Sequence, residues 1–135
     1  MELKEQWIKW EPLSKLDNDF YIDHVIDSYQ DGFKIVVGNH NNKEKKIHIN
    51  FKFGIGSYRN TDELYAWLMQ KDFLHGGSSF YKVINSKYIK WLSEISNGIS
   101  TSMQPDMQHF VVFSEDTTLE ILASYEPEIE FIDLP

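Results

Sequence analysis

The sequence predicts a single α+β domain in which two to three helices pack on one face of an antiparallel sheet. Three observations lead to this prediction. Strand-like segments dominate the first half, segments with helical spacing enter later, and a chain of 135 residues has the usual length of one domain. Because we find no internal repeat, low-complexity tract or linker, residues 1–135 are expected to form one domain.

The strands are predicted from alternation and from turn residues. Residues 21–27 and 33–38 form a hairpin around Asp31 and Gly32, a common turn pair. Residues 46–53 alternate between polar and apolar side chains, which is the pattern of a half-buried strand. Three more strands are expected at residues 80–84, 110–113 and 128–132. Charged side chains in the last of these are typical of an edge strand, where they discourage pairing with another chain.

The helices are predicted from capping residues and spacing. Residues 60–63 can cap a helix that ends near Asp72. Ser86 can cap a second helix, whose apolar stripe is expected to face the core. The stripe consists of Tyr88, Trp91, Leu92 and Ile95. Residues 117–120 resemble a capping box that opens a short third helix through Tyr125.

The composition is that of a folded protein. Hydrophobic residues make up 41% of the chain and aromatic residues 15%, and such side chains offset the entropy that folding removes. The sequence has no cysteine, which excludes disulfides and thiolate metal sites and fits a reducing compartment. Residues 1–10 lack the apolar run of a signal peptide, and nothing approaches a membrane span. We therefore expect a cytoplasmic protein that does not bind membranes.

The charges are unevenly distributed along the chain. Thirteen Lys and Arg against 21 Asp and Glu give a net charge of −8, and every basic residue lies at or before Lys90. An acidic surface repels phosphate groups, so direct nucleic-acid binding is disfavoured. The acidic final third would instead attract a basic partner and accelerate their encounter. Solubility is the simpler explanation of the net charge.

No motif assigns a catalytic residue, a metal site or a cofactor. The five histidines lie at positions 24, 40, 48, 75 and 109, and no two have the spacing of zinc ligands. His109, Ser114 and Asp116 lie close in sequence, but they lack the Gly-x-Ser-x-Gly turn that exposes a nucleophile. We interpret these three residues as structural and expect that the chain is not an enzyme.

Two aromatic residues and one basic residue leave alternatives open. Trp7 and Trp10 could pack on the core or stay exposed for a partner, and packing is favoured. Arg59 is the only arginine, and an ion pair with Asp62 or Glu63 is its simplest role. In the alternative, the chain is a small-ligand or regulatory domain whose Tyr58-Arg59 loop holds an anion.

Three stretches of the sequence resemble a known family. They are YRNTDE at residues 58–63, NSKYIKW at residues 85–91, and HFVVF at residues 109–113 followed by LEILA at residues 119–123 and by Glu126-Pro127. In order and spacing they look like small bacterial immunity proteins that are paired with secreted polymorphic toxins, in particular LXG-type toxins. The resemblance covers most of the chain. It implies a cytoplasmic α+β antitoxin that binds and neutralises one cognate toxin, often a basic nuclease, without catalysis or cofactor.

The resemblance does not transfer interface residues, so the predicted interface comes from local physics. Carboxylates of the final third are expected to face basic groups of the toxin, with Tyr125 as an aromatic anchor. These carboxylates are Glu115, Asp116, Glu120, Glu126 and Glu128. Charge reversal at Glu120 and Glu126 should weaken toxin binding mainly through the association rate. The oligomeric state is left open.

Overall fold

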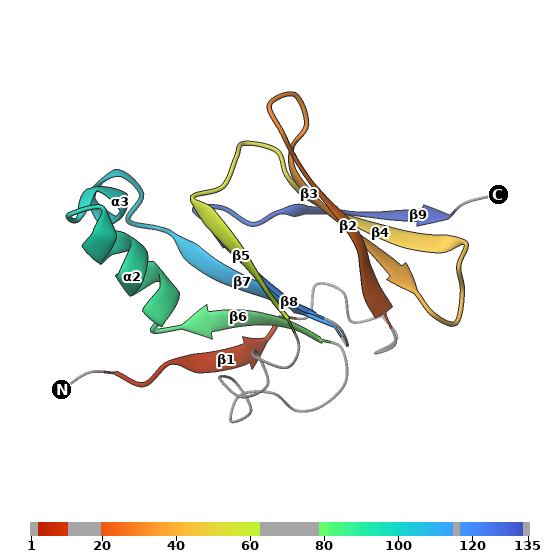
Figure 1. Cartoon of the computed structure of the whole chain (residues 1–135), viewed down its shortest axis with the longest axis horizontal. Helices are drawn as coiled ribbons and strands as arrows, with labels where there is room; N and C mark the ends of the chain where they lie inside the picture. Colours follow the sequence, from red (N-terminus) through yellow and green to blue (C-terminus); the bar gives the residue numbers. More distant parts are fainter. Residues whose placement is uncertain (1–2, 11–19, 63–78, 115–116, 134–135) are drawn as a thin grey trace.

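The computed structural model describes residues 3–10, 20–62, 79–114 and 117–133. The strands in these ranges are β1 (Gln6–Lys9), β2 (Phe20–Ser28), β3 (Gly32–Asn39), β4 (Lys45–Phe51), β5 (Ser57–Asp62), β6 (Ser79–Ile84), β7 (Gln108–Phe113), β8 (Thr117–Ala123) and β9 (Glu128–Asp133). The helices there are α2 (Lys87–Ile95) and α3 (Ile99–Met103). Sheet A has the strand order β1-β6-β7-β8-β5, sheet B has the order β2-β3-β4-β9, and all neighbouring strands are antiparallel (Figure 1).

The predicted α+β class, with two to three helices on one face of a single antiparallel sheet, is wrong. The described chain is mostly β, with two sheets and two short helices. Residues 117–123, expected to open a helix, form β8, and residues 60–62, expected to cap a helix, end β5. Strand β8 is almost entirely buried, so its apolar run lacks the alternation that distinguishes a strand from a helix. The rest of the first predicted helix, residues 63–72, lies outside the described residues.

The other predicted strands and the helix after Ser86 are confirmed. The β2–β3 hairpin turns at Gly32, whose φ of +71° suits glycine. Strand β9 is an edge strand of sheet B, as predicted. Helix α2 begins after Ser86, whose hydroxyl accepts a hydrogen bond from the backbone N–H of Ile89 at 3.0 Å. The expectation that the whole apolar stripe faces the core is wrong, because Tyr88 is buried but Trp91 and Ile95 are 48% and 58% exposed.

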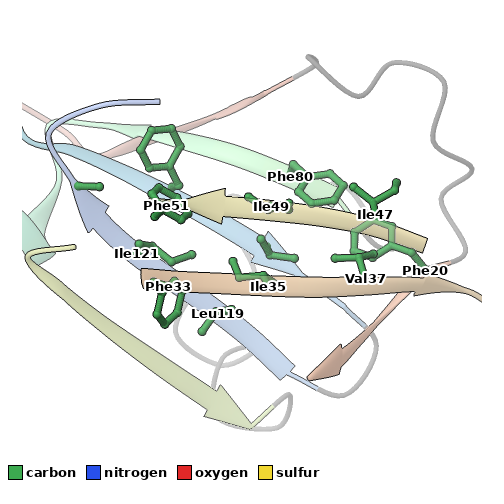
Figure 2. Close-up of a cluster of buried hydrophobic side chains, with 13 residues drawn as sticks. Phe20, Phe33, Ile35, Val37, Ile47, Ile49, Phe51, Phe80, Leu119 and Ile121 are labelled. Carbon is green, nitrogen blue, oxygen red and sulfur yellow. The ribbon is translucent and has the colours of Figure 1, made fainter. Parts of the chain in front are cut away.

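The main hydrophobic core lies between the two sheets. Alternate residues of β3 and β4 point from sheet B toward β7 and β8 of sheet A (Figure 2). The contributors from these four strands are Phe33, Ile35, Val37, Ile47, Ile49, Phe51, Phe110, Val112, Leu119, Ile121 and Ala123. Phe20 of sheet B stacks on Phe80 of sheet A, with ring centroids 4.6 Å apart. Two antiparallel sheets that share one core in this way form a β-sandwich.

A second cluster lies on the opposite face of sheet A and contains Trp7, Tyr81, Val83, Val111 and Phe113. Trp7 reaches this cluster from the short strand β1, while Trp10 packs against Phe80 and Phe110 of the main core. The predicted packing of both tryptophans is therefore confirmed. Figure 1 shows α2 and α3 beside sheet A, away from sheet B. In the ranges that the structure covers, neither helix is long and apolar enough to cross a membrane.

Candidate functional site

A chain of hydrogen-bonded polar side chains lies on the face of sheet A that points away from the main core. Arg59 of β5 is directly opposite Glu120 of β8. Its Nε donates to Oε2 of Glu120 at 2.6 Å and its Nη2 donates to Oε1 at 2.9 Å. Nε2 of His109 lies 3.0 Å from the same Oε1, and Nδ1 of His109 lies 2.7 Å from the Ser86 hydroxyl. The chain thus links β5, β8, β7 and the start of α2.

The ion pair at the centre of this network stays charged although it is largely buried. Glu120 is only 1% exposed, and burial alone would favour its neutral form. Hydrogen bonds from His109 and Arg59 outweigh burial and lower the pKa of Glu120 below its ordinary value. Burial likewise opposes the charge of Arg59, but the hydrogen bond to Glu120 prevails and raises the pKa of Arg59. Because Glu120 accepts from Nε2 of His109, Nδ1 is free to accept from the Ser86 hydroxyl.

Ser86, His109 and Glu120 have the composition of a catalytic triad, but their exposure and hydrogen-bond partners differ from those of a triad. A triad serine has an exposed hydroxyl that can reach a substrate. Here the side chains of His109 and Glu120 are 0% and 1% exposed, and the Ser86 hydroxyl also caps α2. The carboxylate of Glu120 is neutralised by Arg59, so it is not available to stabilise an imidazolium. We therefore interpret these residues as a structural network that holds α2 against sheet A.

Arg59 has internal partners on two sides. Its guanidinium lies 4.1 Å from the ring centroid of Tyr88, whose hydroxyl is 2.5 Å from the Ser57 hydroxyl. Arg59 was expected to pair with Asp62 or Glu63; the structure pairs it with Glu120, and Glu63 lies outside the described residues. The sequence contained one signal for it, since Glu120 is a lone carboxylate in an apolar run and Arg59 is the only arginine. With two of its nitrogens bound to Glu120, Arg59 gives little support to the alternative of an anion site.

A different group of residues gathers at one end of sheet B. The pairings Ser28 with Gly32, Phe33 with Phe51 and Asn50 with Glu128 bring the ends of all four strands together. The β2–β3 turn, the β4–β5 connection and the β8–β9 connection therefore lie side by side. We call the surface formed by residues 27–33, 52–58 and 124–128 the aromatic end. It borders an open groove of about 820 Å³ that is lined by residues 27–29, 32–33 and 52–58.

The aromatic end exposes large apolar side chains. Tyr29, in the β2–β3 turn, is fully exposed, and Phe53, after β4, is 86% exposed. Tyr58, at the start of β5, is 42% exposed, and its ring packs against Phe33 with centroids 4.7 Å apart. Tyr29 and Phe53 were not predicted as site residues. Their position beside turn glycines was the available signal, because side chains in tight turns point to solvent.

Tyr125 fixes the shape of this surface. Its hydroxyl donates to the carbonyl oxygen of Gly54 at 2.7 Å and accepts from the backbone N–H of Phe53 at 2.8 Å. Its ring also packs edge-on against Phe53, with centroids 5.6 Å apart. Burial raises the pKa of Tyr125, which keeps the hydroxyl protonated. The two connections that pass between the sheets are thereby tied together, and Phe53 is held in its exposed position.

The charges of the aromatic end are predominantly acidic. Glu126 pairs with Lys82 of β6, and Glu128 pairs with Lys52 at 2.7 Å. The hydrogen bond that Lys52 donates to Glu128 raises the pKa of Lys52. Asp27 and Asp31 are exposed in the β2–β3 hairpin. These four carboxylates outnumber the two lysines that pair with two of them, so this region is net negative.

The predicted interface residues are divided among three locations. Tyr125, Glu126 and Glu128 come together at the aromatic end. Glu120 is buried with both carboxylate oxygens bound, so the structure does not place it at a surface where it could meet a partner. Glu115 and Asp116 lie outside the described residues.

In the described part of the chain, no three side chains of His, Asp or Glu are grouped so that they could hold a metal ion. Comparison of the chain with protein-family models, with curated proteins and with solved structures finds no match.

Proposed function

We propose that this chain is an immunity protein, a cytoplasmic antitoxin that binds and neutralises one cognate secreted bacterial toxin. The observation that carries the proposal is the pair of exposed aromatic side chains, Tyr29 and Phe53, at an acidic end of the β-sandwich. Aromatic side chains are enriched in protein interfaces, where they fill pockets of the partner and supply much of the binding energy. The resemblance of the sequence to immunity proteins points in the same direction.

The aromatic end is well suited to tight binding because it is held in shape before a partner arrives. Phe53 is fixed by its backbone hydrogen bond and ring contact with Tyr125, and Tyr29 lies in a short turn between two paired strands. A surface that needs little ordering on association loses less entropy and binds more tightly. Tyr125 therefore supports this surface through its hydroxyl as well as through its ring.

The charge of the aromatic end indicates the class of partner. Asp27, Asp31, Glu126 and Glu128 belong to the aromatic end and are exposed, and the whole chain carries −8. Complementary charge accelerates association and rejects partners of the same sign. A basic toxin, such as a nuclease that must itself bind phosphates, fits this surface.

The proposal is tested with the protein that is encoded next to this chain. We expect the two proteins to co-purify and the chain to suppress the toxicity of its neighbour in cells. In surface plasmon resonance, the double variant E126K/E128K should lower the association rate about 10-fold at low salt, with a smaller effect at high salt.

The matched control for this experiment is E94K, which reverses one exposed carboxylate on α2, outside the aromatic end. It should change the association rate less than half as much as one reversal at the aromatic end. Thermal unfolding of each variant verifies that the fold is kept. Absence of any complex, or equal effects per reversed charge at both places, contradicts the proposal.

A further inference from the structure

We infer that the groove at the aromatic end takes a cationic side chain, arginine or lysine, from an extended segment of the partner. The identity of that partner as a toxin rests on the proposed function, whereas the chemistry of the groove does not. Four aromatic residues line the groove, and three of them are exposed, Tyr29, Phe53 and Tyr58, whereas Phe33 is buried. Aromatic faces attract guanidinium and ammonium groups, most strongly where water is displaced.

Two of these rings are held in place by internal neighbours. The ring of Tyr58 lies against Phe33 at 4.7 Å, and the ring of Phe53 lies against Tyr125 at 5.6 Å. The two rings are therefore available to a ligand without first being ordered, which lowers the entropic cost of binding. Tyr29 is fully exposed in the β2–β3 turn, where a ligand in the groove would cover it.

The charges of the groove select a cation over an anion. Asp27 is the only carboxylate among the described lining residues, and it is exposed. Lys52 is the only cation among them, and its ammonium is held by Glu128 at 2.7 Å. A positive group that enters the groove thus meets aromatic faces and a carboxylate, while the one lysine is already paired. An anion would have to compete with Glu128 for Lys52.

Another part of this chain already binds a cation between an aromatic ring and a carboxylate. The guanidinium of Arg59 lies 4.1 Å from the Tyr88 ring and pairs with Glu120. A partner arginine between the aromatic rings and Asp27 would reproduce that combination of an aromatic face and a carboxylate. The groove volume of about 820 Å³ exceeds one side chain and leaves room for the backbone on either side of it.

The experiment is a two-dimensional ¹⁵N–¹H NMR titration with the tripeptide Ac-Gly-Arg-Gly-NH₂. The control peptide carries citrulline, which has nearly the shape of arginine but no charge. We expect saturable shifts of the amide signals of Tyr29, Phe53 and Tyr58 with the arginine peptide, and binding about 5-fold weaker or more with citrulline. Each of Y29A, F53A and D27N should weaken binding about 3- to 10-fold.

F131A is the matched control, because Phe131 is an exposed aromatic residue of β9 that does not line the groove. It should bind the arginine peptide like the wild type. Equal binding of both peptides, shifts that do not saturate, or full binding by Y29A and F53A overturns the inference. If the toxin binds through Tyr29 and Phe53 but the arginine peptide does not bind, the proposed function stands and this inference fails. If the peptide binds and the toxin does not, the inference stands and the proposed function fails.

Discussion

Arg59 and Glu120 lie opposite each other across the edge of sheet A and form a two-point ion pair between residues 61 positions apart in sequence. Replacing Glu120 by glutamine should lower the free energy of unfolding by about 2–4 kcal/mol, because the guanidinium loses the charge that offsets its burial. The loss should not exceed this range, since the Arg59 side chain is 41% exposed and water can replace part of the interaction. Urea unfolding at pH 7 measures it.

The control for this substitution is E126Q, which removes the charge of an exposed carboxylate that pairs with Lys82. Its free energy of unfolding should change by less than about 1 kcal/mol. Equal losses for E120Q and E126Q would show that the buried pair has no special role in stability.

The same ion pair should make stability depend on pH. The pKa of Glu120 in the folded chain lies below its ordinary value of 4.5. Its contribution to stability is therefore complete above that value and is lost as the pH falls through the folded pKa. The difference in unfolding free energy between the wild type and E120Q should shrink as the pH is lowered from about 7 to about 3. A difference that is constant over this range contradicts the assignment.

Elements were predicted correctly where residues close in sequence determine the structure. The alternation of residues 46–53 predicted β4, and Ser86 predicted the start of α2. Strand β8 was missed because burial on both faces removes alternation, and its threonines resemble helix-capping residues. The Arg59–Glu120 pair depends on the register between β5 and β8, which no local pattern contains.

The candidate site could be predicted only in part for the same reason. Tyr125, Glu126 and Glu128 were predicted because they lie together in sequence. Tyr29 and Phe53 lie beside them only because strand pairing brings the β2–β3 turn and the β4–β5 connection to the same end of sheet B. Charge along the sequence also gave Glu120 a surface role, whereas the sheet places it in the interior.

Replacing Ser86 by alanine should destabilise the chain by about 1–3 kcal/mol. The substitution removes the cap of α2 and leaves Nδ1 of the buried His109 without the hydroxyl it contacts. Thermal unfolding followed by circular dichroism measures the loss. S102A, which changes an exposed serine of α3, should stay within about 0.5 kcal/mol of the wild type. If both variants behave alike, the network through Ser86 does not stabilise the fold.

Replacing Tyr125 by phenylalanine should lower the free energy of unfolding by about 1–2 kcal/mol. The ring is kept, but the backbone N–H of Phe53 and the carbonyl of Gly54 lose their common partner. Hydrogen exchange of the Phe53 amide should become faster than in the wild type. Y29F, which removes the hydroxyl of a fully exposed tyrosine, is the control and should leave stability and this exchange rate unchanged. Unchanged exchange in Y125F would contradict the role of Tyr125 as the tie between the two connections.

The central proposal, that the aromatic end binds a toxin, is tested most directly by isothermal titration calorimetry with the protein encoded beside this chain. The wild type, the double variant Y29A/F53A and the control F131A are compared at one salt concentration. We expect the double variant to bind at least about 30-fold more weakly than the wild type, and F131A to stay within about 3-fold. Equal affinity of the double variant and the wild type would contradict the account.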